Sequence, residues 1–217
     1  MQHHFTNILF DLDGTLTDSK EGIFNSAVYA LNQFGINVED KEPLNAILGP
    51  PLKNSFMKLY GFDEEKAIEA VEKYREYFSQ KGIFENRPYE GIKMLLKHLN
   101  DRNKIVILAT SKPTVYANRI LEKYDLISYF AFVYGSELDG TRANKEDVIE
   151  YALEQSNIQN LSETVMVGDR NYDIIGAKQA KIASIGVLYG YAQDDELKEA
   201  QADYLVNSVS ELESLLI

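Results

Sequence analysis

Two hydrophobic patterns follow one another along these 217 residues. From residue 18 to about residue 84, apolar side chains recur every three or four positions, as in Ile23, Ala27 and Leu31, which is typical of amphipathic helices. From about Tyr89 onwards, short continuous apolar runs alternate with helical stretches. Continuous runs are typical of strands that are buried on both faces of a parallel sheet. The pattern therefore predicts an α/β fold with a parallel sheet core, interrupted by an all-helical insertion.

The periodicity and the turn residues set the expected bounds of these elements. The predicted helices of the insertion are residues 18–34, 43–49, 52–60 and 63–82. The predicted strands are residues 8–10, 104–110, 130–134, 164–168, 183–187 and 204–206. Between them, helices are expected from about residues 89, 113, 144 and 171. Asp18 with Glu21, and Ser208 with Glu211, have the spacing of capping boxes and are expected to begin the first and the last helix.

The composition limits the class of protein. With 45% apolar and 26% charged residues, it is ordinary for a soluble globular protein. No apolar run approaches the ~18 residues of a membrane span, and the polar start Met1–His4 lacks the apolar region of a signal peptide. The chain contains no cysteine, and its net charge of −12 argues against nucleic acid as a partner. We therefore expect a cytoplasmic protein that binds neither a membrane nor nucleic acid.

Two carboxylates stand at the end of the first predicted strand. Residues Ile8–Phe10 are followed directly by Asp11, Asp13 and Gly14, so both aspartates emerge on the same side of the chain. Burying them without a partner is costly, and a hard cation such as Mg2+, which prefers oxygen ligands, would neutralise them. Asp11 could then act as a nucleophile while Asp13 transfers a proton.

This short pattern has two simpler explanations. Taken alone, Asp-x-Asp-Gly is more often an ordinary turn, and it is also found in calcium-binding loops. The calcium loop requires further oxygen ligands and a glutamate in the same segment, and Thr15–Thr17 do not supply the alternating ligands. Residues further along the chain favour the catalytic interpretation over the turn.

Polar residues also follow other predicted strands. Thr110–Lys112 follow the second strand, Lys145 begins the helix after the third, and Asp169 and Asp173 follow the fourth. In a parallel sheet of this kind ligands bind at the carboxyl ends of the strands. We therefore expect these residues to gather beside the first pair of aspartates.

Each of these residues has a chemical role and a structural alternative. Thr110, expected just before a helix, offers a hydroxyl and backbone N–H groups to an anion, and Lys145 brings a positive charge. Asp169 and Asp173 lie four positions apart at the start of a helix, so both can face one cation. Separately, each is also explained as a helix cap, a solvated helix start or a turn. Together, each at its own strand end, they point to a site.

The whole set resembles the four motifs of the haloacid dehalogenase superfamily, in order and over essentially the whole chain. The matching residues are Asp11, Asp13, Thr110, Lys145, Asp169 and Asp173. The resemblance implies a Rossmann-like core formed by residues 1–17 and 86–217, with a small helical cap domain over residues 18–85. Residues Gly49–Leu52 and Ser136–Arg142 are similar to the phosphoglycolate phosphatase branch of the superfamily.

The resemblance implies a Mg2+-dependent phosphatase acting through an aspartyl-phosphate on a small phosphomonoester, either phosphoglycolate-like or a nucleoside monophosphate. It implies that Asp11 is the nucleophile and Asp13 the general acid and base. Thr110, Ser111 and Lys145 are expected to bind the phosphoryl oxygens. A monomer or a weak homodimer is expected.

The resemblance also assigns the metal ligands and residues of the cap. The metal would be bound by Asp11, by the backbone carbonyl of Asp13 and by Asp169, while Asp173 would support the metal shell or Lys145. A second group, Gly49 and Lys53, is expected to contact the substrate from the cap. Many relatives have a proline after the motif lysine, where this chain has Glu146, so the local loop is expected to differ.

Three other functions share features with this chain. A phosphosugar mutase of the β-phosphoglucomutase type resembles the chain in the same motifs, and a product assay separates the two. A receiver-type phospho-switch module also combines an α/β fold with a phosphorylated aspartate. The helical insertion exceeds what a small receiver needs, and Asp13 would hydrolyse the aspartyl-phosphate that a switch preserves. A dehalogenase has no need of the second aspartate.

Overall fold

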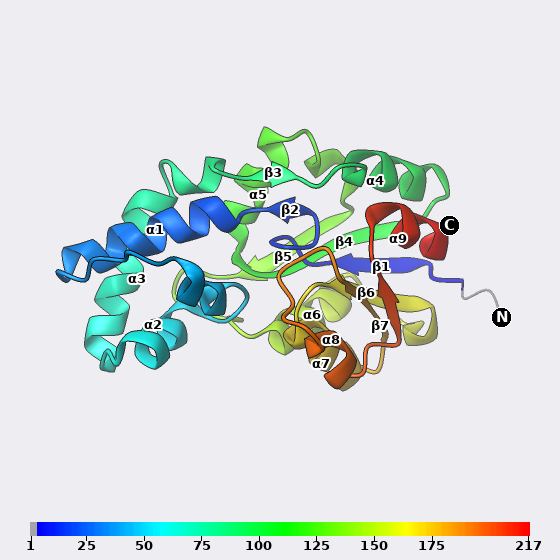
Figure 1. Cartoon of the computed structure of the whole chain (residues 1–217). Coiled ribbons are helices and arrows are strands. Elements are labelled where there is room, and N and C mark those ends of the chain that lie inside the picture. The colour runs from blue at the N-terminus through cyan, green and yellow to red at the C-terminus, as the bar shows by residue number, and fades with distance from the viewer. Residues whose placement is uncertain (1–3) are drawn as a thin grey trace. The chain divides into compact units, whose positions relative to one another are not determined.

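The chain consists of two compact units in the computed structural model, which describes residues 4–217. The first three residues of the polar start therefore lie outside the described residues. One unit is formed by Ser19–Arg87 and the other by the segments before and after it. The smaller unit begins after the two-residue strand β2 (Thr17–Asp18) and ends in the two-residue strand β3 (Arg87–Pro88). In Figure 1 the colour follows the chain from blue to red.

The larger unit is built on a parallel sheet. Its strands are β1 (Asn7–Phe10), β4 (Ile105–Pro113), β5 (Phe132–Ser136), β6 (Thr164–Gly168), β7 (Ala183–Val187) and β8 (Tyr204–Val206). They lie side by side in the order β5–β4–β1–β6–β7–β8, and every neighbouring pair is parallel. The predicted α/β fold with a Rossmann-like parallel sheet is therefore confirmed.

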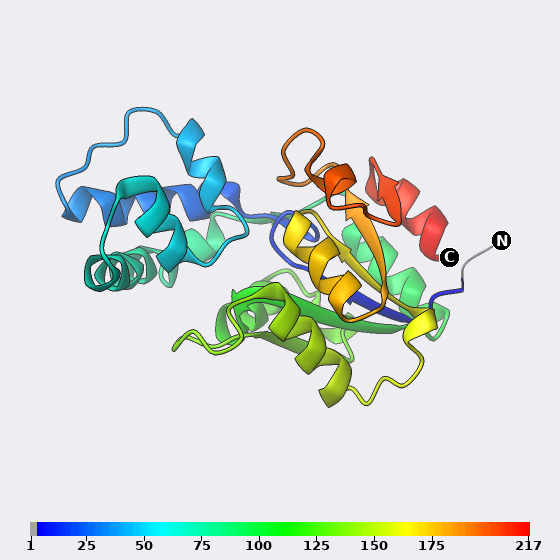
Figure 2. The same cartoon turned by 90° about the horizontal axis from the view of Figure 1, so that it is seen from below.

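Helices cover both faces of this sheet (Figures 1 and 2). On one face lie α4 (Ile92–Asp101), α5 (Thr114–Lys123) and α9 (Val209–Leu216), and on the other lie α6 (Lys145–Gln155), α7 (Asn171–Gln179) and α8 (Glu196–Glu199). Two 3-10 helices, η3 (Ile127–Tyr129) and η4 (Leu161–Glu163), precede β5 and β6. Right-handed crossovers place the helices on opposite faces because the strand order reverses at β1. Leu9, Ile107 and Met166 of the strands pack against Val148 and Ala177 of the helices.

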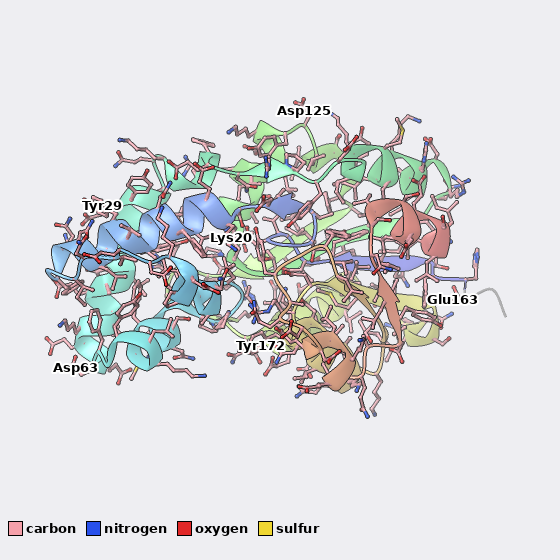
Figure 3. The ribbon with its side chains drawn as sticks, in the orientation of Figure 1. Lys20, Tyr29, Asp63, Asp125, Glu163 and Tyr172 are labelled. Carbon is pink, nitrogen blue, oxygen red and sulfur yellow. The ribbon has the colours of Figure 1, made fainter. Side chains whose placement is uncertain are left out.

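The position of β1 determines where the polar residues emerge. All four of its residues are buried, and it is flanked on both sides, so the apolar run forms an interior strand. Phe10 lies opposite Leu108 of β4 and Val167 of β6. Asp11 follows at once and still donates its backbone N–H to the carbonyl of Val167, at 2.9 Å. The residues after these strands therefore share one edge of the sheet, the edge at which Tyr172 of α7 lies (Figure 3).

The smaller unit is helical, as its periodicity predicts. Its elements are α1 (Lys20–Gln33), η1 (Glu42–Ile47), α2 (Leu52–Tyr60), α3 (Glu64–Phe78) and η2 (Gly82–Phe84). Helices α1 and α3 pack together through buried residues such as Ala27, Leu31 and Ala70. Asp63, labelled in Figure 3, begins α3 by accepting a hydrogen bond from the backbone N–H of Lys66, at 2.9 Å.

The prediction that Asp18 caps the first helix is wrong. The N-cap of α1 is Ser19, without a side-chain cap bond, and Asp18 belongs to β2. A tertiary contact explains the difference, because Asp18 Oδ1 accepts a hydrogen bond from the hydroxyl of Tyr191, at 3.1 Å. The carboxylate is thus used for a long-range contact within the larger unit, and the capping box with Glu21 does not form.

Two further helix predictions hold only in part. The stretch predicted as a helix over residues 43–49 is the 3-10 helix η1. At the start of α9, Ser208 Oγ accepts from the backbone N–H of Glu211, but the Glu211 carboxylate accepts from Asn207, so only half of the capping box is formed. Across residues 4–217, the longest apolar helices fall short of what crossing a membrane requires.

Candidate active site

Three buried carboxylates meet at the carboxyl edge of the sheet. Asp11 follows β1, Asp169 follows β6, and Asp173 lies in the first turn of α7. One oxygen from each lies within 4.8 Å of the others. Asp11 is 8% exposed, and the other two are fully buried. The edge expected from the sequence thus brings these three residues together.

Lys145, the first residue of α6, lies among them. Its Nζ is 2.6 Å from Asp11 Oδ1 and 3.0 Å from Asp173 Oδ1, and it donates to the carbonyl of Ala109 at 3.1 Å. Burial alone would lower the pKa of Lys145, but the charges of Asp11 and Asp173 outweigh it and raise the pKa above its usual value. Lys145 is therefore a fixed positive charge in contact with the proposed nucleophile.

The carboxylates carry more negative charge than Lys145 balances. Burial, followed by the charges of Asp173 and Asp11, raises the pKa of Asp169 well above its usual value. Burial also raises the pKa of Asp173, to about 6, although Lys145 opposes the effect. Three carboxylates against one ammonium leave an excess of two negative charges, which a divalent cation would neutralise. An all-oxygen donor set of this kind fits Mg2+.

Asp13 forms an ion pair that sequence analysis missed. Lys112 Nζ lies 2.8 Å from Asp13 Oδ2, and both side chains are largely buried. Asp13 Oδ1 is buried and has no hydrogen-bond partner among the described residues, so this oxygen is available to a substrate or a water molecule. The available signal was the position of Lys112 two residues after Thr110, at the end of its strand.

Thr110 lies at this edge, but not in the expected setting. It was predicted just before a helix, whereas β4 continues to Pro113 and α5 begins only at Thr114. The reason is continued pairing with β5, up to the match between Pro113 and Ser136. The Thr110 hydroxyl is buried and accepts from the backbone N–H of Lys112, at 3.3 Å. The predicted end of the strand at Thr110 is therefore wrong, whereas the helix begins within one residue of its predicted start.

Ser111 is held against the neighbouring strand. Its carbonyl accepts a hydrogen bond from Ser136 Oγ at 2.7 Å, in the irregular stretch where the register between β4 and β5 shifts. Binding of phosphoryl oxygens by Ser111 and Thr110 stays a prediction.

The loop after β7 was also missed by sequence analysis. The backbone N–H of Tyr191 donates to Asp169 Oδ2 at 2.7 Å. A Cβ atom at Gly190 would lie 2.3 Å from Asp169 Cβ, and one at Gly14 would lie 2.1 Å from Asp169 Oδ2. Gly14 also has a φ of +86°, which favours glycine. Both glycines therefore allow backbone to approach Asp169 closely. Gly190 at another strand end was the signal in the sequence.

The two predicted cap residues lie in the smaller unit. Gly49 is exposed and has a φ of +103°, which suits glycine. Lys53, in α2, forms an exposed ion pair with Glu64, with Nζ 2.9 Å from Oε1. Their role in substrate binding stays a prediction.

Comparison with known proteins identifies the family of this chain. A family model described as haloacid dehalogenase-like hydrolase matches residues 8–187. The chain belongs to this family. The superfamily resemblance is thereby confirmed, as is the prediction of an enzyme, and the receiver-type switch is excluded.

Individual relatives match along nearly the whole chain. A 5'-nucleotidase from Pseudomonas aeruginosa is 43% identical over 212 residues, which cover 98% of this chain and 96% of the relative. The crystal structure of a predicted phosphatase from Clostridium acetobutylicum has a TM-score of 0.94 at 53% identity and covers 97% of both chains. The tyrosine-protein kinase PtkA of Mycobacterium tuberculosis is 35% identical, over 94% of this chain and 69% of the relative.

The predicted branch is also found among the relatives. A phosphoglycolate phosphatase from Vibrio parahaemolyticus is 28% identical over 213 residues, covering 94% of this chain and 93% of the relative. Relatives of this chain thus carry different names, so the substrate has to be argued separately from the family.

Proposed function

We propose that this chain, a phosphatase of the haloacid dehalogenase-like family, requires Mg2+ and hydrolyses a small phosphomonoester through an aspartyl-phosphate on Asp11. The observation that carries the proposal is the set of three buried carboxylates around Lys145. Asp11, Asp169 and Asp173, with the backbone carbonyl of Asp13, would hold the ion. When bound, Mg2+ supplies positive charge that neutralises the phosphoryl oxygens.

The first step transfers the phosphoryl group to Asp11. A carboxylate oxygen of Asp11 attacks phosphorus, the bond from phosphorus to the ester oxygen breaks, and Asp13 protonates the departing alcohol. Lys145 neutralises charge on the group in transfer, and Thr110 donates its hydroxyl to a phosphoryl oxygen. Phosphoryl transfer depends on such positioning and neutralisation more than on covalent assistance.

The second step releases phosphate. Asp13, now a carboxylate, takes a proton from water as the water oxygen attacks phosphorus, and the bond between Asp11 and phosphorus breaks. Asp13 thus acts first as acid and then as base. Lys112, 2.8 Å from Asp13 Oδ2, holds that carboxylate in place.

For the substrate we propose a nucleoside monophosphate or a phosphoglycolate-like ester. The name of the 43% identical relative supports the nucleotide, and that of the Vibrio relative supports phosphoglycolate. An acidic protein with a net charge of −12 needs local positive charge to attract such anions. Mg2+ would supply that charge together with Lys145 and Lys112, whose own charges are offset by the neighbouring aspartates.

A panel of phosphomonoesters tests both parts of the proposal. Purified protein is assayed for phosphate release from nucleoside 5'-monophosphates, phosphoglycolate and hexose phosphates, in EDTA and again after Mg2+ is added in excess. We expect release only with Mg2+, and the highest kcat/KM for a nucleotide or for phosphoglycolate. Full activity in chelator would refute the metal requirement. An isomerised hexose phosphate without net release would identify a mutase instead.

A further inference from the structure

Glu196 joins two segments of the larger unit through one carboxylate. Oε1 accepts from Arg170 Nε and from the backbone N–H of Asn171, both at 2.8 Å. Oε2 accepts from the backbone N–H of Gln193, at 3.0 Å. Burial raises the pKa of Glu196, but these hydrogen bonds outweigh it and lower the pKa below its usual value. The side chain, 12% exposed, is therefore an ionised acceptor of three hydrogen bonds, with both oxygens engaged.

Both segments that Glu196 connects are close to Asp169, one along the chain and the other through a hydrogen bond. Arg170 and Asn171 are the next two residues after Asp169 and begin α7. Gln193 stands two residues after Tyr191, whose backbone N–H donates to Asp169 Oδ2. The Glu196 carboxylate thus holds the residues that follow Asp169 in the chain. It also holds the loop whose Tyr191 N–H donates to the Asp169 carboxylate.

One of these two segments also forms a hydrogen bond with Asp173. The backbone N–H of Arg170 donates to Asp173 Oδ2 at 3.0 Å, while Asp173 Oδ1 faces Lys145. A shift of the Arg170 backbone would therefore turn the Asp173 carboxylate as well. Tyr172, labelled in Figure 3, and Gln193 line a surface hollow of about 600 Å³, so solvent borders the two segments that Glu196 connects.

We propose that Glu196 is a positioning residue for the metal site, which sets the affinity for Mg2+ without contacting the ion. It does so by holding the start of α7 and the loop after β7 so that Asp169 and Asp173 present their oxygens in one orientation. Partners of metal ligands commonly change metal affinity when they are replaced. The inference rests on the proposed Mg2+ requirement.

Three variants separate this role from a merely structural one. Glu196→Gln removes the charge and one acceptor oxygen. Glu196→Asp keeps the charge but shortens the side chain by one methylene, so it tests placement alone. Asp195→Asn is the matched control, because Asp195 is the adjacent residue, is exposed, and forms an exposed ion pair with Lys198.

The measurement is the dissociation constant of Mg2+ alone, by titration calorimetry of the full chain, together with the Mg2+ dependence of turnover. We expect Glu196→Gln and Glu196→Asp to bind Mg2+ about 10-fold more weakly or worse, and kcat to recover at saturating Mg2+. Asp195→Asn should bind Mg2+ like the parent. Circular dichroism confirms folding, and if Glu196→Gln does not fold, Glu196→Asp carries the test.

Three results would overturn the inference, and each has a different meaning. If the parent binds Mg2+ and both Glu196 variants bind it equally well, Glu196 only stabilises the fold, even if the melting temperature falls. If the parent itself binds no Mg2+, the proposed function fails first and the inference fails with it. Equal weakening in Asp195→Asn would assign the effect to surface charge and would also refute positioning.

Discussion

Asp11 and Asp13 have identical side chains two positions apart, but their different surroundings suit them to different chemical roles. Asp11 is buried against Lys145, with 2.6 Å between Oδ1 and Nζ, and borders the carboxylate cluster. Asp13 pairs with Lys112 and keeps one buried oxygen without a partner among the described residues. Phosphoryl transfer requires a nucleophile beside the metal site and a proton donor slightly apart from it. The positions of Asp11 and Asp13 fit these two roles.

Replacing Asp11 by asparagine tests the nucleophile. Asp11→Asn keeps nearly the same shape but removes the attacking oxyanion, so no phosphoenzyme should form and turnover should be lost. Mass spectrometry of acid-quenched protein measures the phosphoenzyme, and circular dichroism checks that the variant folds. A folded Asp11→Asn protein that still accumulates phosphate on a side chain would contradict the assignment.

Replacing Asp13 by asparagine tests the proton transfer. Asp13→Asn leaves the nucleophile intact but can neither protonate the leaving group nor activate water, so turnover should fall by roughly 10²–10⁴-fold. With an activated ester, whose leaving group needs no proton, the first step should survive better than the second. Phosphate should then accumulate on Asp11. Turnover close to that of the parent, or label on another residue, would show that the roles are wrong.

Helix α2 carries the predicted substrate contact Lys53. Lys53 forms an ion pair with Glu64, and both side chains are exposed, so the pair contributes little to stability. If Lys53 binds an anionic substrate, Lys53→Ala should raise KM about 10-fold with little change in kcat, since it removes binding energy common to substrate and transition state. Steady-state kinetics with the preferred ester measures both constants.

Glu64 provides the matched control for that experiment. Glu64→Gln removes the partner of Lys53 but leaves the lysine, so KM should stay at the parent value or fall. Equal increases in KM for Lys53→Ala and Glu64→Gln would mean that the ion pair only supports the helices of the smaller unit, and the predicted contact would then be rejected.

At the scale of single helices and strands, the sequence predicts correctly those bounds that depend on the local pattern of residues. Strands β6, β7 and β8 have their predicted bounds because each is a short apolar run between turn residues. Long-range contacts override the prediction elsewhere. Pairing with β5 extends β4 past Thr110, and the hydroxyl of Tyr191 removes Asp18 from the helix cap. The contacts of Glu196 are also long-range, so no local pattern reveals them, whereas the position of Lys112 at the end of its strand is visible in the sequence although its pairing with Asp13 is not.

At the scale of the whole molecule, the buried acidic cluster links stability to pH and metal. In the metal-free protein burial is the main cause that raises the pKa of Asp173 from 3.8 to about 6, and burial also raises the pKa of Asp169 well above its usual value. As pH rises from about 4 to 6, the unfolded chain has already released these protons while the folded chain retains them. The contribution of these two groups to stability is therefore fully present below pH 4 and is lost as pH rises through the folded pKa values.

Mg2+ should reverse this loss, because it binds the ionised carboxylates and only in the folded protein. We expect the increase in melting temperature between EDTA and saturating Mg2+ to be larger at pH 8 than at pH 5. Differential scanning calorimetry at both pH values measures it, and comparing the two conditions at one pH cancels the titration of all distant groups. Asp169→Asn is the control and should lose most of the Mg2+-dependent increase. An increase of the same size at pH 5 and pH 8 would show that Mg2+ does not bind at this cluster.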